Sequence, residues 1–191
     1  DDFVVMSREA GDCEEAQARI EHVLGRLGLR LHPQKTRRVV LAAGQEGFDF
    51  LGCHLHKRMS GRLWQQKGLR RYYLHRWPSQ RAMKRVRARV RELTPRRCCH
   101  RDMRSVIAEL NPVLRGWGQY FRNGNAANKF VGVDAYVVRR LKGLRLKRAG
   151  RNLRAGKARS WDRDCFEKLG LYRLRGTIRY PGPAYWQQES A

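Results

Sequence analysis

Three stretches after residue 80 carry apolar residues at steps of three and four, which is the spacing of one face of an α-helix. These stretches extend over residues 82–93, 103–121 and 130–144. Arg and Lys fill most of the remaining positions of the first stretch and several of those in the third. Amphipathic helices become stable when their apolar faces pack together, so this pattern predicts a helical bundle with a basic exterior.

The ends of these helices can be placed from single residues. Ser79 precedes the first apolar stretch and is a favoured N-cap, and "TPRR" ends that helix after Leu93. Asn111 and Pro112 lie inside the second stretch. Two alternatives stay open there, because the helix could kink at the proline or restart with Asn111 as its cap and Pro112 at its first position.

The charge of the chain indicates which class of partner it binds. Among 191 residues there are 42 Lys and Arg against 17 Asp and Glu, a net charge of +25. The planar fork of donors on Arg matches phosphate geometry, so this excess favours a nucleic-acid partner. A membrane is the competing explanation, but no apolar run approaches the roughly 20 residues of a spanning helix, and no lipidation motif is present.

The five cysteines suggest neither a disulfide framework nor a zinc site. Their count is odd, two of them are adjacent, and they form no CxxC pair and no Cys/His zinc spacing. We interpret them as reduced intracellular thiols. This predicts a cytoplasmic, RNA-associated protein, and no signal peptide is expected because the first residues are acidic.

The first part of the chain, residues 1–77, has a mixed pattern. Residues 3–6 predict a buried strand, and a helix follows with Asp12 as its cap and Gly28 at its end. Strands are expected over about 36–41 and 48–55, joined by the turn "AAGQEG". A further hairpin, "GRLWQQKGLRRYYLH", is expected to carry Trp64, Tyr72 and Tyr73 on extended segments.

Two more regions follow: a helical region over residues 78–150 and a basic, aromatic tail over 151–191. The tail carries Trp161, Tyr172, Tyr180, Tyr185 and Trp186 between basic residues. Such interleaving suits stacking on unpaired bases. Packing of these aromatics on the bundle is an equally acceptable interpretation.

The first two residues, Asp1 and Asp2, stand directly before the expected strand at 3–6. Adjacent carboxylates at a strand end can hold divalent metal ions, as in two-metal phosphoryl transfer. Two aspartates alone are also typical of a solvated turn, which is the simpler interpretation until further motifs are considered.

Those further motifs come next along the chain. A strand, a capped helix, "LGLRLHPQKTRRVV" and "FDFLGCHLH" follow in the order found in the palm of a reverse transcriptase, which this part of the chain resembles. The resemblance implies that Asp1 and Asp2 bind two Mg²⁺ ions. It also implies that Lys35 lies near the leaving pyrophosphate and that the segment Phe50, Leu51 and Gly52 grips the primer.

The helical region narrows the family. "LNPVLRGWGQYFRNGNAANKFVGVDAYVVRRLKGLRLKR" resembles the maturase domain, or domain X, of group II intron-encoded reverse transcriptases, and "PSQRAMKRVRARVRELTPR" resembles the first thumb helix. The residues that carry the likeness are Asn111, Pro112, Gly116, Trp117, Tyr120 and Phe121. We expect the three aromatics of this motif to lie in the core. The residues expected to contact RNA phosphates are Arg85, Arg89, Arg139, Arg140 and Arg145.

The expected fold is α+β, a partial polymerase palm of antiparallel strands with a helix, followed by an all-α thumb/maturase helical bundle. The resemblance implies an RNA-directed DNA polymerase that takes a DNA primer and dNTPs, and a maturase that binds group II intron RNA. The resemblance begins inside the Asp-Asp motif, so we expect this chain alone to be inactive as a polymerase. A non-catalytic RNA-binding module and a degenerate remnant are the alternatives.

Overall fold

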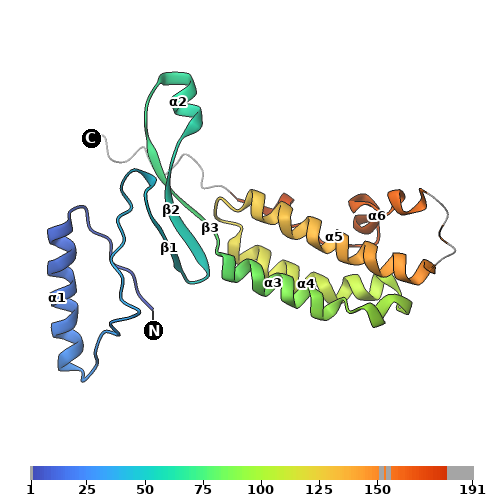
Figure 1. Ribbon diagram of the computed structural model, residues 1–191, viewed down its shortest axis with the longest axis horizontal. Helices are drawn as coiled ribbons and strands as arrows, with labels where there is room; N and C mark the ends of the chain where they lie inside the picture. Colours follow the sequence, from blue (N-terminus) through green and yellow to red (C-terminus); the bar gives the residue numbers. More distant parts are fainter. Residues whose placement is uncertain (1, 151–152, 154–155, 180–191) are drawn as a thin grey trace. The chain divides into compact units, whose positions relative to one another are not determined.

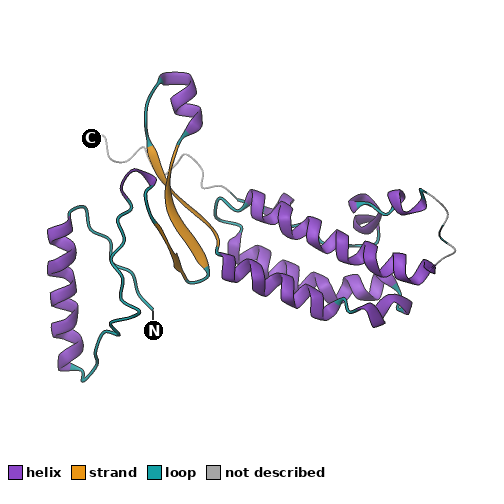
Figure 2. Cartoon of the chain, in the orientation of Figure 1, coloured by secondary structure: helices purple, strands orange, loops and turns teal. Residues whose placement is uncertain are grey.

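The computed structural model describes residues 2–150, 153 and 156–179, and these form the expected α+β fold. Six α-helices and a three-stranded antiparallel sheet are present in this part of the chain (Figure 2). The chain divides into two compact units, Asp1–Leu51 with His56–Tyr73, and Gly52–Leu55 with Leu74–Ala191. In the described residues, no helix is both long enough and apolar enough to cross a membrane.

The first unit contains one long helix, α1 (Ala10–Arg26). It begins after Glu9 rather than at Asp12, which lies in the first turn, where the helix dipole favours an acid. It ends at Gly28 as predicted. The Leu29 N–H donates to the carbonyl of Leu24 at 2.9 Å, and Gly28 takes a φ of 70°, the left-handed conformation that glycine adopts without strain.

The prediction of a strand is wrong for two stretches of this unit. Residues 3–6 and 36–41 form no strand, and the side chains of 3–6 are exposed. Strands need a neighbour for their backbone hydrogen bonds, and no described segment pairs with either stretch. The short helix η1 (Ala42–Gly44) stands where the turn "AAGQEG" was expected.

The third predicted strand, over 48–55, is divided in two. It forms β1 (Gly47–Phe50) and β2 (Cys53–Met59), which are joined by a turn at Leu51 and Gly52. Both turn residues have positive φ, 46° and 76°, the values of a two-residue turn that matches the twist of the flanking strands. A turn that begins with a leucine is not visible in the sequence pattern of residues 48–55.

The sheet order is β1-β2-β3, with β3 at Tyr72–Pro78. The expected hairpin before β3 is instead a helix, α2 (Gly61–Lys67), which Ser60 caps and Gly68 ends. Trp64 therefore lies on a helix, whereas Tyr72 and Tyr73 lie on a strand as predicted.

The second unit is built on three helices that contain the three predicted stretches, and the third helix extends beyond its stretch at both ends. These are α3 (Gln80–Leu93), α4 (Met103–Phe121) and α5 (Ala127–Ala149). The Ser79 hydroxyl accepts from the Ala82 N–H at 3.2 Å and so caps α3. Helix α4 continues through Pro112, so it does not restart there.

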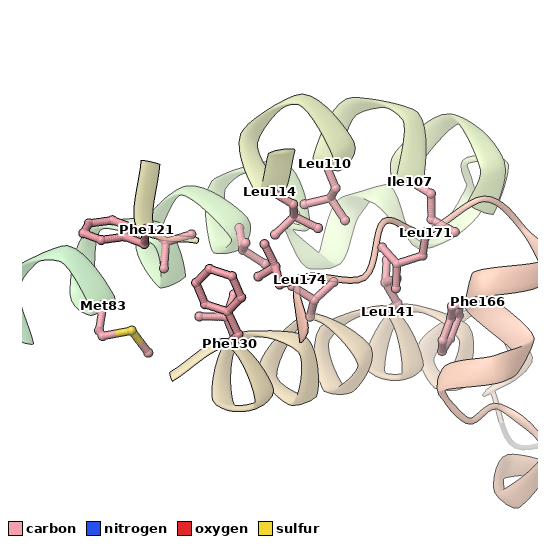
Figure 3. Close-up of a cluster of buried hydrophobic side chains, with 14 of the residues drawn as sticks. Met83, Ile107, Leu110, Leu114, Phe121, Phe130, Leu141, Phe166, Leu171 and Leu174 are labelled. Atoms are coloured by element: carbon pink, nitrogen blue, oxygen red, sulfur yellow. The ribbon is translucent and has the colours of Figure 1, made fainter. Parts of the chain in front are cut away.

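The three apolar faces meet in one core, in which Leu110, Leu114, Phe130 and Leu141 are almost completely buried (Figure 3). The following segment closes this core with Phe166 of α6 (Arg163–Lys168), Leu171 and Leu174. Shorter helices complete the unit: η2 (Arg96–His100), η4 (Lys157–Ser160) and η5 (Arg175–Thr177).

Two polar side chains attach the segment 170–175 to the bundle. Asn111 of α4 donates to the Gly170 carbonyl at 2.8 Å and accepts from the Tyr172 N–H at 2.9 Å. Asp134 of α5 is 5% exposed and accepts from the N–H groups of Leu174 and Arg175, both at 3.1 Å. Burial raises the pKa of the Asp134 carboxyl, while these two hydrogen bonds oppose the rise.

We predict that Asp134→Asn lowers the free energy of unfolding by about 1–3 kcal/mol, because the asparagine amide presents only one acceptor and leaves one buried N–H unpaired. Urea denaturation at neutral pH measures this change. An unchanged midpoint would contradict the role given to Asp134.

The raised pKa of Asp134 also determines the direction in which the free energy of unfolding changes with pH. The folded chain holds this proton to higher pH than the unfolded chain does, so the carboxyl loses stabilising free energy as pH rises above about 4. The difference in unfolding free energy between wild type and Asp134→Asn should therefore narrow as pH rises through this window. A difference that widens would show that the carboxylate is the favoured form.

Candidate nucleic-acid interface

Helix α3 turns a dense set of cations away from the core. All of them are exposed: Arg81, Lys84, Arg85, Arg87, Arg89 and Arg91. Arg89 forms an ion pair with Glu92 of its own helix, with 2.9 Å between guanidinium nitrogen and carboxylate oxygen. Arg85 is exposed on the same helix, so it is the better placed of the two predicted phosphate contacts.

An aromatic side chain links the cations of α3 to those of α5. The guanidinium carbon of Arg87 lies 5.9 Å from the ring centre of Tyr136, and that of Arg139 lies 5.3 Å from the same centre. Cation–π contacts hold both guanidinium groups at the ring. The sequence analysis did not identify Tyr136 or Arg87 as part of this surface. In the sequence, Tyr136 is only an aromatic beside the apolar stripe.

A shallow depression of about 490 Å³ adjoins this pair on α5. It is lined by Ala135, Val138, Arg139, Lys142, Asp162, Arg163 and Asp164. Three cations and two carboxylates share the lining. Phosphate binding is therefore favoured at Arg139 and Lys142 on α5 and opposed near Asp162 and Asp164.

Two of the predicted phosphate contacts have internal partners instead. Arg140 donates to the Thr94 hydroxyl at 3.0 Å and also to the Thr94 carbonyl, so it ties α5 to the buried end of α3. The Arg145 guanidinium lies 5.2 Å from the Trp161 ring centre and donates to the Cys165 thiol sulfur at 3.3 Å. Both side chains hold the fold together, so a role in phosphate contact stays a prediction.

The described residues include only part of the site predicted for the palm. Asp1 lies outside the described residues, and Asp2 is exposed in a segment without helix or strand. Lys35 is exposed in a turn, and its own N–H donates to the His32 carbonyl at 3.0 Å. The described part of the chain holds no group of three or more His, Cys, Asp or Glu suited to a metal ion. Because Asp1 lies outside the described residues, the two-ion Mg²⁺ site that the resemblance implies stays a prediction.

The segment predicted to grip a primer forms the turn between β1 and β2. Phe50 is half-buried at the end of β1, and Leu51 is 59% exposed. The Gly52 carbonyl accepts from the Ser79 N–H at 2.9 Å, which joins this turn to the start of α3. Gripping a primer remains a prediction for all three residues.

The aromatics of the predicted motif on α4 differ in burial. Phe121 is buried, and the Trp117 ring centre lies 4.9 Å from that of Phe121 and 5.3 Å from that of Phe130. Tyr120 is 57% exposed, so the expectation that it belongs to the core is wrong. It lies on the solvent side of the helix, one position before Phe121.

These helices carry the decisive similarity. A model of the maturase-specific domain of group II introns matches residues 83–161, from within α3 to just before α6. Residues 83–161 form a group II intron maturase-specific domain. A search of curated proteins finds no match for the chain.

The maturase-specific domain is thus confirmed where the sequence motifs indicated it. Its Asn111 bonds to residues 170 and 172, and its Asp134 bonds to residues 174 and 175. The polar anchors of the domain therefore hold a segment beyond its matched range. Exposed cations of α3 and α5 lie on the surface of this domain, where they can meet a polyanion.

Arg139 and Arg140 are neighbours with different partners, and a pair of variants separates their roles. We predict that Arg140→Gln lowers the free energy of unfolding by about 1–3 kcal/mol, since it removes hydrogen bonds to buried Thr94. Arg139→Gln should cost no more than about 1 kcal/mol, the scale of an exposed cation–π contact. Urea denaturation of both variants checks this, and equal losses would contradict the assignment.

Proposed function

We propose that the maturase-specific domain binds group II intron RNA through the α3–α5 basic face, which we define as Arg85, Arg87, Arg139 and Lys142, and that this binding favours the spliceable fold of the RNA. The observation that carries the proposal is the placement of Arg87 and Arg139, from two helices, on the ring of Tyr136.

Three physical features support this surface over others. Its arginines present planar donor forks that suit phosphate oxygens. The Tyr136 ring restrains two of these side chains before any RNA arrives, which lowers the entropy cost of binding. The bundle core beneath is closed by buried apolar side chains, so the face is supported by rigid elements.

Binding through phosphates has a measurable signature. Each phosphate contact to single-stranded RNA contributes about −0.7 to the slope of log affinity against log salt. We predict that the double variant Arg85→Gln/Arg139→Gln binds a transcribed group II intron RNA more weakly and with a salt slope less steep by roughly 1–2. Filter binding over a salt series measures both quantities.

The control is Arg104→Gln, which removes an exposed cation of α4, a helix that contributes no residue to the α3–α5 basic face. It should leave affinity and slope close to those of wild type. The single variant Arg85→Gln also removes one charge and is measured beside it. Equal effects of Arg104→Gln and Arg85→Gln would indicate non-specific attraction and contradict the proposed face. Splicing of the same intron RNA at limiting Mg²⁺ then shows whether binding also assists folding.

We further propose that residues 1–77 serve reverse transcription, with Asp1 and Asp2 toward Mg²⁺, Lys35 toward pyrophosphate, and DNA primer and dNTP as partners. The order of motifs along the chain and the presence of a maturase-specific domain behind them support this. Asp1 lies outside the described residues, so the Mg²⁺ ions enter this proposal only through the resemblance.

The purified chain should give no detectable primer extension on an RNA template with dNTPs and Mg²⁺, since its described residues gather no three-ligand metal group. A gel-based extension assay beside an active reverse transcriptase as positive control measures this. Extension above background would contradict the prediction. Retained RNA binding without extension would favour the alternative of a non-catalytic RNA-binding module over a degenerate remnant.

A further inference from the structure

A second basic surface lies in the first unit, outside the maturase-specific domain. Residues 50–91 contain no Asp or Glu. Within this stretch, residues 56–73 form what we call the basic arm, the end of β2, helix α2 and the start of β3, with α2 at its tip (Figure 1). Its cations in sequence are Lys57, Arg58, Arg62, Lys67, Arg70 and Arg71.

The arm exposes aromatic rings beside these cations. Trp64 of α2 is 42% exposed, and the Arg70 guanidinium carbon lies 5.1 Å from its ring centre. Tyr73 of β3 is 41% exposed. The neighbouring Tyr72 points to the opposite side of the strand. It is 39% exposed, and part of its ring lies close to Gly44, where an added Cβ would be 3.5 Å away.

Helix α1 of the same unit provides an internal comparison. There Arg19 pairs with Glu15, and Arg38 pairs with Glu14 at 2.8 Å, so carboxylates of α1 partly neutralise nearby cations. The arm has no carboxylate of its own for Lys67 or Arg70. It therefore presents positive charge and exposed ring faces together, the combination that binds single-stranded nucleic acid.

We propose that the basic arm binds an unpaired stretch of RNA, with bases stacking on Trp64 and Tyr73 and phosphates contacting Lys67 and Arg70. This goes beyond the proposed function, which places intron RNA on α3 and α5 within residues 83–161 and gives residues 56–73 no contact with RNA. An RNA duplex keeps its bases stacked inside and offers the arm phosphates only, so exposed rings favour unpaired RNA as the occupant.

The test uses the full chain and two RNA probes. One is a fluorescein-labelled single strand of about 12 nucleotides, within the range that such surfaces cover, and the other is a duplex of the same length. Trp64→Ala/Tyr73→Ala should bind the single strand roughly tenfold or more weakly, with a change of less than about twofold on the duplex. Trp64→Phe keeps a ring and should retain most of the affinity.

Two charge variants show whether binding depends on cations in the arm or only on the net charge of the chain. Lys67→Gln/Arg70→Gln removes two positive charges from the arm, and Arg8→Gln/Arg30→Gln removes two exposed ones elsewhere in the same unit. Only the arm variant should weaken single-strand binding by more than about threefold. Ultraviolet cross-linking of wild type to the single strand should place cross-links on the peptide that contains Trp64 or Tyr73.

Unchanged single-strand affinity of Trp64→Ala/Tyr73→Ala, with an unchanged circular dichroism spectrum, would overturn the proposal. An equal loss on duplex and single strand would overturn it as well, because it would indicate phosphate attraction without stacking. Failure here leaves the maturase proposal separately testable, since Arg85→Gln/Arg139→Gln reports on structured intron RNA through another surface.

Discussion

The cost of burying a guanidinium without a partner governs how this chain packs. With 42 Lys and Arg in 191 residues, each helix of the second unit must keep its cations on the outside or give them internal partners. The apolar faces of α3, α4 and α5 can then meet only one another. Most of the molecule's surface chemistry follows from this separation, because the excluded cations gather on the solvent sides of the same helices.

Three polar side chains of the bundle form hydrogen bonds that connect its parts. Asp134 accepts two backbone N–H groups, Asn111 bonds both ways with residues 170 and 172, and Arg140 bonds to Thr94. Each of these contacts joins segments far apart in the sequence. Buried hydrogen bonds of this kind select one arrangement of helices among several that would bury similar apolar area.

The arginines of the chain thus divide into two groups with different physical tasks. Arg140 and Arg145 have protein partners at the junctions of α5 with Thr94 and with α6. Arg85 and Arg139 remain at the surface, and Arg139 shares the ring of Tyr136 with Arg87. An RNA bound to this face would meet side chains that the fold has already oriented, on elements that the core holds rigid.

The sequence by itself determined the three helices of the bundle, the Ser79 cap, the Gly28 end of α1 and the maturase-specific domain. These depend on neighbours within one or two helical turns, so a local pattern contains the information. It could not determine whether residues 3–6 and 36–41 form strands, because a strand depends on a partner segment that its own residues do not specify.

Only the tertiary structure decided which cations are free to meet RNA. Arg139 and Arg140 are adjacent and chemically identical, yet one lies on Tyr136 at the surface and the other is bonded to Thr94. Tyr120 and Phe121 are likewise adjacent, and only the second is buried. Successive residues on a helix point about 100° apart, so the partner of each side chain is set by how the helices pack around one another.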